Sequence, residues 1–234
     1  NWTDDSKQVV MQQLNRLRFA NAFPDDPRAP AVYYIALQRE FDQNSWEETV
    51  NMAARLVTWQ PAPPSDLTTE ALLLSGHSLS ELARYAEAEQ AYSDALATMA
   101  ENDERRGSVR ENLAAAVYRQ AEQLADAGNV EAAVSEFLRV GSAVPESVLR
   151  ANAEYDAASL LITANLWDQA ISVLTSFRRA FPDHELIDTV PAKLALAYRE
   201  TEQWERAADE LQQMVALATT PEERRENLLI AAEL

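Results

Sequence analysis

Apolar residues in the middle of the chain recur at the spacing of an α-helix. Between residues 107 and 126, the apolar positions follow one another at steps of three or four residues: Val109, Leu113, Val117, Ala121 and Leu124. A second stripe of the same kind runs from Val130 to Val140, and Gly128 and Asn129 interrupt the pattern between the two stripes. Because the interruption is so short, the pattern predicts two antiparallel helices.

This hairpin pattern repeats along the chain. A bulky residue followed by polar and small residues recurs at Trp46, Tyr85, Val130, Trp167 and Trp204, with gaps of 39, 45, 37 and 37 residues. The octapeptides FANAFPDD at 19–26 and FRRAFPDH at 177–184 repeat a helix ending. A single hairpin cannot bury both of its apolar stripes, so successive hairpins are expected to stack. We expect the aromatic residues that follow this period, among them Tyr92, to lie in the core.

Small residues on the second helices identify the kind of repeat. Ala88, Ala133, Ala170 and Ala207 stand at equivalent places, where only a small side chain lets paired helices approach closely. In the unit at 69–100 the pattern continues with Leu72, Gly76, Leu79, Tyr92 and Ala95. This combination resembles the tetratricopeptide repeat, or TPR. The resemblance implies an all-α fold, a right-handed α-solenoid of TPR-like helix hairpins with a period of about 37 residues.

The resemblance extends over nearly the whole chain, so we expect residues 1–234 to form a single TPR solenoid segment. The full units are expected at about 30–61, 69–100, 114–147, 151–184 and 188–221. Partial units are expected at 5–24, which has the pattern of a second helix alone, and at 222–234, which has that of a first helix alone. Solenoids usually end in a polar cap, so this pattern predicts a segment cut from a longer array.

Charge and composition narrow the classes of function. The net charge is −18, from 38 acidic and 20 basic residues, and such an acidic protein repels phosphate backbones. We therefore expect no nucleic-acid partner, and the short apolar runs predict no direct insertion into a membrane. The chain has no cysteine, and its two histidines, His77 and His184, lie far apart. Without a metal-ligand cluster or a glycine-rich phosphate loop, we expect no metal, no cofactor and no enzymatic activity.

The resemblance to TPR proteins also implies a binding surface. In that family, particular first-helix positions line the concave face, and these correspond here to the candidate partner-binding residues His77, Tyr118, Glu122, Asn152, Tyr155 and Arg199. Tyr118 and Tyr155 occupy equivalent positions one repeat apart, and such aromatic residues make good anchors for a peptide. The alternative for both tyrosines is partial burial between neighbouring helices. His184 is expected to be a solvated turn residue.

Two longer phrases suggest a location. AFPDDPRAPAVYYIAL and AFPDHELIDTVPAKLALAY resemble repeats of bacterial cell-envelope proteins, which implies a periplasmic location, with the cytoplasm as the alternative. The function that follows is a non-catalytic protein–protein interaction scaffold, binding a peptide or protein segment on its concave face in a bacterial envelope assembly. The alternative is a structural spacer, or a self-association module acting through the solenoid ends, within a larger multi-repeat protein.

Overall fold

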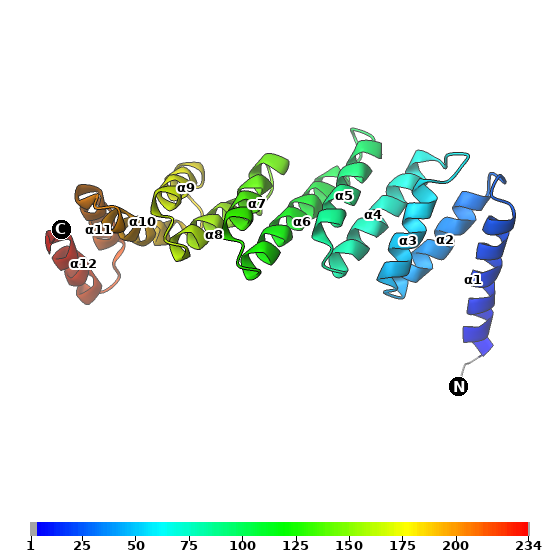
Figure 1. The fold of residues 1–234 in the computed structure, drawn as a ribbon, viewed down its shortest axis with the longest axis horizontal. Helices are drawn as coiled ribbons and strands as arrows, with labels where there is room; N and C mark the ends of the chain where they lie inside the picture. Colours follow the sequence, from blue (N-terminus) through cyan, green and yellow to red (C-terminus); the bar gives the residue numbers. More distant parts are fainter. Residues whose placement is uncertain (1–3, 234) are drawn as a thin grey trace. The chain divides into compact units, whose positions relative to one another are not determined.

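The computed structural model describes the backbone of residues 4–233 and the side chains of residues 11–232. Over the described residues the chain forms twelve α-helices and one short 3₁₀-helix, with no strand (Figure 1). The predicted all-α fold built from helix hairpins is therefore confirmed. The chain divides into two compact units, residues 1–116 and residues 117–234, and the boundary falls inside one helix, α6.

Unit 1 contains an opening helix, two complete hairpins and the first half of α6. Its helices are α1 (Asp4–Ala22), α2 (Ala29–Asp42), α3 (Trp46–Val57), α4 (Ser65–Glu81), α5 (Tyr85–Thr98) and the beginning of α6 (Arg106–Asp126). From α1 to α5, consecutive helices pack against one another, and α2 also contacts α4. Buried apolar side chains from adjacent helices, such as Leu37 of α2 and Leu56 of α3, form the core.

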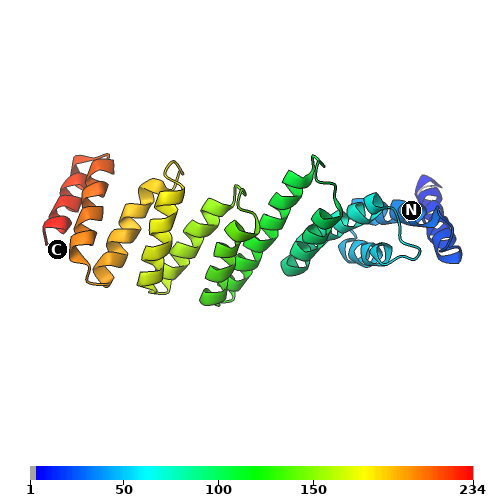
Figure 2. The same cartoon turned by 90° about the horizontal axis from the view of Figure 1, so that it is seen from above.

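Unit 2 begins with the second half of α6 and continues the same hairpin arrangement. Its further elements are α7 (Val130–Ala143), α8 (Arg150–Thr163), α9 (Trp167–Ala180), the 3₁₀-helix η1 (Ile187–Thr189), α10 (Val190–Glu200), α11 (Trp204–Leu217) and α12 (Pro221–Glu233). Figure 2 shows the helices from α8 to α12, coloured yellow to red, lying side by side, and consecutive members are in contact. Leu174, Phe177 and Leu194 are buried at the centre of this stack.

The small residues of the second helices are fully buried, as expected for places where paired helices approach closely. Ala88, Ala133, Ala170 and Ala207 have no exposed surface. In α3 the corresponding residue is Thr49, which is also fully buried, and its hydroxyl donates a hydrogen bond of 3.0 Å to the Ser45 carbonyl. The larger polar residue is accommodated there because its hydroxyl is satisfied within its own helix.

The aromatic residues of the period are less buried than expected. Trp46, Tyr85 and Trp167 are half-buried, and Trp204 is 43% exposed, so the prediction that these rings lie in the core is wrong for Trp204. Each of the four is the first residue of a second helix, which places its ring at the end of a hairpin. Tyr92, two turns further along α5, is only 2% exposed.

The turn inside each hairpin is closed by one residue in the left-handed conformation. These residues are Asn44, Ala83, Gly128, Asn165 and Glu202, with φ between 55° and 76°. In each turn the next residue donates its N–H to the carbonyl five residues earlier, as from Asn129 to Leu124 at 2.9 Å. This is the hydrogen bond of a Schellman motif, and it reverses the chain within three residues.

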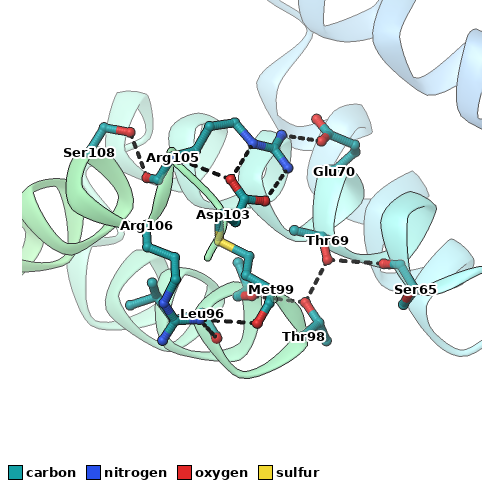
Figure 3. Close-up of polar contacts among 11 residues, drawn as sticks. Ser65, Thr69, Glu70, Leu96, Thr98, Met99, Asp103, Arg105, Arg106 and Ser108 are labelled. Carbon is teal, nitrogen blue, oxygen red and sulfur yellow. Dashed lines mark hydrogen bonds and ion pairs between the residues drawn. The ribbon is translucent and has the colours of Figure 1, made fainter. Parts of the chain in front are cut away.

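Four of the turns that lead into a first helix share a second device, in which one side chain accepts the N–H of the residue two positions later. The four accepting residues are Asp26, Asp103, Ser147 and His184, at distances of 2.9, 2.9, 3.1 and 3.3 Å. Figure 3 shows the example at Asp103, where the Arg105 side chain also folds back onto the same carboxylate and reaches Glu70 of α4. We call these four the inter-hairpin turns.

Gly76 of α4 is expected to be required by packing. A Cβ at this position would lie 2.7 Å from a ring carbon of the buried Tyr92, whereas a Cβ at Gly107 of α6 would meet nothing within 4 Å. We expect Gly76→Ala to lower the free energy of unfolding by about 1–3 kcal/mol, because the core is overpacked. The matched control Gly107→Ala should change it by no more than about 1 kcal/mol, in the stabilising direction.

Urea denaturation of the two variants measures both effects. An equal response of the two glycines would contradict the close contact between α4 and α5.

Candidate functional site

The six candidate residues are distributed over both units. His77 belongs to α4 in unit 1, whereas unit 2 contains Tyr118, Glu122, Asn152, Tyr155 and Arg199. The residues of unit 2 lie on the first helices of consecutive hairpins, α6, α8 and α10, and we call them the unit 2 face. On α8, Asn152 and Tyr155 are three residues apart and therefore share one side of the helix.

Tyr118 is half-buried and connects α6 to the next hairpin. Its ring lies edge-on to Phe137 of α7, with the ring centroids 5.2 Å apart, and its hydroxyl donates a hydrogen bond to a carboxylate oxygen of Asp156 on α8. Burial, followed by the contact with Asp156 and the charge of Glu122, raises the pKa of Tyr118. The phenol therefore stays protonated and remains a hydrogen-bond donor.

Tyr155 repeats this arrangement one hairpin later with a different partner. Its hydroxyl lies 2.7 Å from the Thr189 hydroxyl, which itself donates to the Leu186 carbonyl at 2.6 Å. Because a threonine hydroxyl has a single hydrogen, Tyr155 must be the donor to Thr189. The ring centroids of Tyr155 and Phe177 are 5.7 Å apart. The ammonium group of Lys193, a residue of α10, lies 5.1 Å from the centroid of the Tyr155 ring.

Lys193 is a residue of this surface that sequence reasoning missed. It lies 37 residues after Asp156, the repeat period, so the two occupy equivalent positions. An acidic group therefore contacts Tyr118, and a basic group contacts Tyr155. The sequence shows the change from an acidic residue, Asp156, to a basic one, Lys193, at one repeat position. Only the packing shows that the residue at this position contacts the tyrosine of the preceding hairpin.

The remaining residues of the unit 2 face differ in burial and in their contacts with other residues. Glu122 forms an ion pair of 2.6 Å with Arg119 on the same helix, Asn152 is half-buried and Arg199 is exposed. Next to them on α8, the hydroxyls of Ser159 and Thr163 donate back to backbone carbonyls, each at 3.0 Å. The unit 2 face therefore offers ring surfaces and charged groups rather than free hydroxyl hydrogens.

His77 lies on an exposed part of unit 1, with one side of its ring covered. Its Nδ1 atom is 3.0 Å from the Tyr92 hydroxyl, and the two rings meet edge-on with centroids 5.5 Å apart. The Phe41 ring lies 6.4 Å away. Partial burial lowers the pKa of His77, and the charge of Glu81 opposes this shift.

The expectation that His184 is a solvated turn residue is wrong. Its ring is half-buried and meets the buried Phe177 edge-on, with the centroids 5.5 Å apart. Its Nδ1 atom accepts the Leu186 N–H at 3.3 Å, as a carboxylate or a hydroxyl does in the other inter-hairpin turns. Sequence reasoning missed this role because no turn motif with a histidine as the acceptor of a backbone N–H was recognised at that position.

Among the residues whose side chains are described, no cluster of three or more histidine, aspartate or glutamate residues could hold a metal ion. Of the described helices, none is both long enough and apolar enough to cross a membrane. The chemistry that the unit 2 face offers is binding through aromatic surface, hydrogen bonds and charge.

No protein-family model and no curated protein sequence matches the chain. The fold is similar to that of YrrB, a TPR protein with an unusual peptide-binding site, at 16% identity over 92% of this chain and 98% of that chain, with a TM-score of 0.41. It is also similar to MamA from Desulfovibrio magneticus RS-1, at 20% identity over 68% and 89% of the two chains, with a TM-score of 0.43.

A third similar structure is the TPR2AB domain of yeast Sti1 in its pHSP90 complex, at 12% identity over 97% of this chain and 98% of that chain, with a TM-score of 0.39. At these identities and TM-scores the similarity concerns the helical fold alone. The assignment of the fold therefore rests on the helices of this chain itself.

The environment of His77 predicts a pH dependence of stability. Its pKa in the folded protein lies below the ordinary value of 6.5, so the unfolded chain takes up the proton first. The free energy of unfolding of the wild type, relative to His77→Gln, should therefore fall as the pH decreases from 6.5 through the folded-state pKa.

Urea titrations of both proteins at pH 7.5 and 5.0 measure this difference. His184 and the carboxylates are present in both proteins, so their contributions cancel. A difference that does not change with pH would contradict the partial burial of His77.

Proposed function

We propose that the chain is a non-catalytic scaffold that binds a peptide or protein segment on the unit 2 face. The observation that carries the proposal is the pair formed by Tyr118 and Tyr155, which stand on consecutive first helices. Each ring is half-buried and each hydroxyl is held by a residue of the following hairpin. Two rigid aromatic anchors one repeat apart suit an extended segment, because little side-chain entropy is lost on binding.

The charges beside the two tyrosines indicate that this binding is directional. Asp156 contacts Tyr118 and Lys193 contacts Tyr155, so a bound segment meets a negative group at one anchor and a positive group at the other. Glu122 adds negative charge near Tyr118. A segment with a basic residue at the first anchor and an acidic residue at the second is favoured over its reverse.

For the location, we propose a bacterial envelope assembly in the periplasm. The support is the resemblance of the phrases at 22–37 and 180–198 to repeats of bacterial cell-envelope proteins. The cytoplasm is the alternative, and fractionation of the native host followed by immunodetection of the chain distinguishes the two.

Binding can be tested without a known partner by selecting peptides from a random library on the immobilised full chain. The affinity of a selected peptide is then measured by fluorescence anisotropy for the wild type and for the double variant Tyr118→Ala/Tyr155→Ala. We expect the double variant to bind at least about tenfold more weakly, as expected for the loss of aromatic anchors. Unchanged affinity with the helical circular dichroism intact would exclude these anchors.

Two control variants separate the possible causes of lost binding. Tyr85→Ala removes a half-buried tyrosine from the start of a second helix in unit 1 and should leave the affinity unchanged. Tyr118→Phe/Tyr155→Phe keeps both rings and removes the hydroxyl contacts with Asp156 and Thr189. If this variant binds as the wild type does, the rings are the anchors; if it binds as weakly as the alanine variant, the hydroxyl contacts are needed.

A second candidate function, self-association through an end helix, is favoured by the surface of α12. Leu228 and Leu229 are 50% and 54% exposed, and together with Arg224 and Arg225 they line an open groove of about 420 Å³. An exposed apolar surface of this kind is typical of protein contacts.

Light scattering over a range of concentrations tests this second candidate. Self-association predicts a mass that grows with concentration for the wild type and stays at 26.1 kDa for Leu228→Glu/Leu229→Glu. A wild type that stays at the monomer mass would exclude self-association and leave peptide binding as the proposed function.

A further inference from the structure

His184 differs chemically from the three other acceptors of the inter-hairpin turns. Asp26 and Asp103 accept hydrogen bonds from Arg28 and Arg105, which lower the pKa of both carboxyls, that of Asp26 to about 2. The Ser147 hydroxyl does not titrate. Those three turns therefore keep their acceptor at any pH near neutrality, whereas histidine is the side chain that gains a proton between pH 5 and 8.

The hydrogen bond at His184 requires the neutral imidazole. Its Nδ1 atom accepts the Leu186 N–H, so the proton of the neutral ring is on Nε2. When the ring takes up a second proton, Nδ1 becomes a donor and faces another donor. The acceptor is then lost, and the two N–H groups repel each other.

This turn is linked directly to the unit 2 face. The Leu186 carbonyl accepts the hydroxyl hydrogen of Thr189, and Thr189 in turn accepts the hydroxyl hydrogen of Tyr155. The turn is also closed by the hydrogen bond from the Ile187 N–H to the His184 carbonyl, at 2.9 Å. Leu186 is therefore connected to Tyr155 by two hydrogen bonds, one at each side of the Thr189 hydroxyl, so a displacement of Leu186 is expected to affect Tyr155.

Charged groups surround His184 on several sides. Asp183 and Glu185 are its neighbours in the chain, and Asp188 lies in η1. The Arg150 guanidinium of α8 lies 5.3 Å from the centroid of Phe181, a ring that contacts His184. Glu154 partly offsets this charge through its ion pair of 3.0 Å with Arg150.

We propose that the turn at His184 is a pH-sensitive element that controls the position of Tyr155. Near neutral pH the imidazole holds the Leu186 N–H, and Thr189 is fixed against Tyr155. On acidification the protonated imidazole releases this N–H, the turn between α9 and α10 loosens, and the contact between Tyr155 and Thr189 is weakened. The proposal concerns the protein alone and holds whether or not Tyr155 contacts a partner.

The test follows hydrogen exchange of the Leu186 amide by NMR in the full chain labelled with ¹⁵N-leucine. Protection is expressed relative to the intrinsic exchange rate at each pH. Between pH 7.5 and 5.0 we expect the protection of Leu186 to fall about three- to tenfold in the wild type, the size expected for one lost hydrogen bond. In His184→Ser, which copies the acceptor of the turn at Ser147, the protection should stay constant.

A converse variant guards against a general effect of acid. Ser147→His places an imidazole in the equivalent turn between α7 and α8, where the Ser147 hydroxyl accepts the Leu149 N–H at 3.1 Å. We expect the Leu149 amide to gain the pH dependence that Leu186 shows in the wild type. The wild-type measurement is repeated in the His77→Gln background, where the pH dependence of Leu186 should persist because the other histidine has been removed.

The link to the unit 2 face is read from the ¹³C ring resonances of Tyr155. They should move with pH in the wild type, with the same midpoint as the Leu186 protection, and stay fixed in His184→Ser. Equal pH dependence of Leu186 in the wild type and in His184→Ser would overturn the proposal. So would a wild-type Tyr155 that does not respond while Leu186 does.

Discussion

The close approach of two antiparallel helices at one fully buried small residue is the constraint on which the rest of each unit depends. Ala88, Ala133, Ala170 and Ala207 have no exposed surface, and a side chain this small leaves room for the neighbouring helix to pack closely. Once the helices are held at this distance, the chain must reverse within three residues. It does so through a left-handed residue followed by the Schellman hydrogen bond.

The repeated turns show how much chemical variation this geometry tolerates. The left-handed position is occupied by Asn, Ala, Gly, Asn and Glu in the five hairpins, although a Cβ there costs roughly 1–2 kcal/mol. The inter-hairpin turns likewise use Asp, Asp, Ser and His as the acceptor of one backbone N–H. Because the backbone hydrogen bonds are the same in each case, the chemical nature of the accepting side chain can vary from turn to turn.

The unit 2 face is built by the same repetition of hairpins, and at one repeat position the charge of the side chain changes from negative to positive. Tyr118 and Tyr155 are equivalent, and so are Asp156 and Lys193, the residues that contact them from the following hairpin. A regular scaffold thereby presents two similar rings in opposite electrostatic surroundings. In the proposed function, this difference distinguishes the two directions in which a segment could bind.

The sequence by itself determined the all-helical class, the pairing of helices and the buried alanines, because these follow from local periodicity and side-chain size. At Gly128 it also predicted a helix end. The tertiary structure decided the exposure of Trp204 and the hydrogen bond between Tyr118 and Asp156. It also decided that His184 accepts the Leu186 N–H. The contact between Tyr118 and Asp156 joins residues 38 positions apart, and the ring of His184 packs on Phe177 of the preceding helix. Such contacts depend on how the side chains of different helices are placed in space. Periodicity alone specifies only the face of the helix on which each side chain lies.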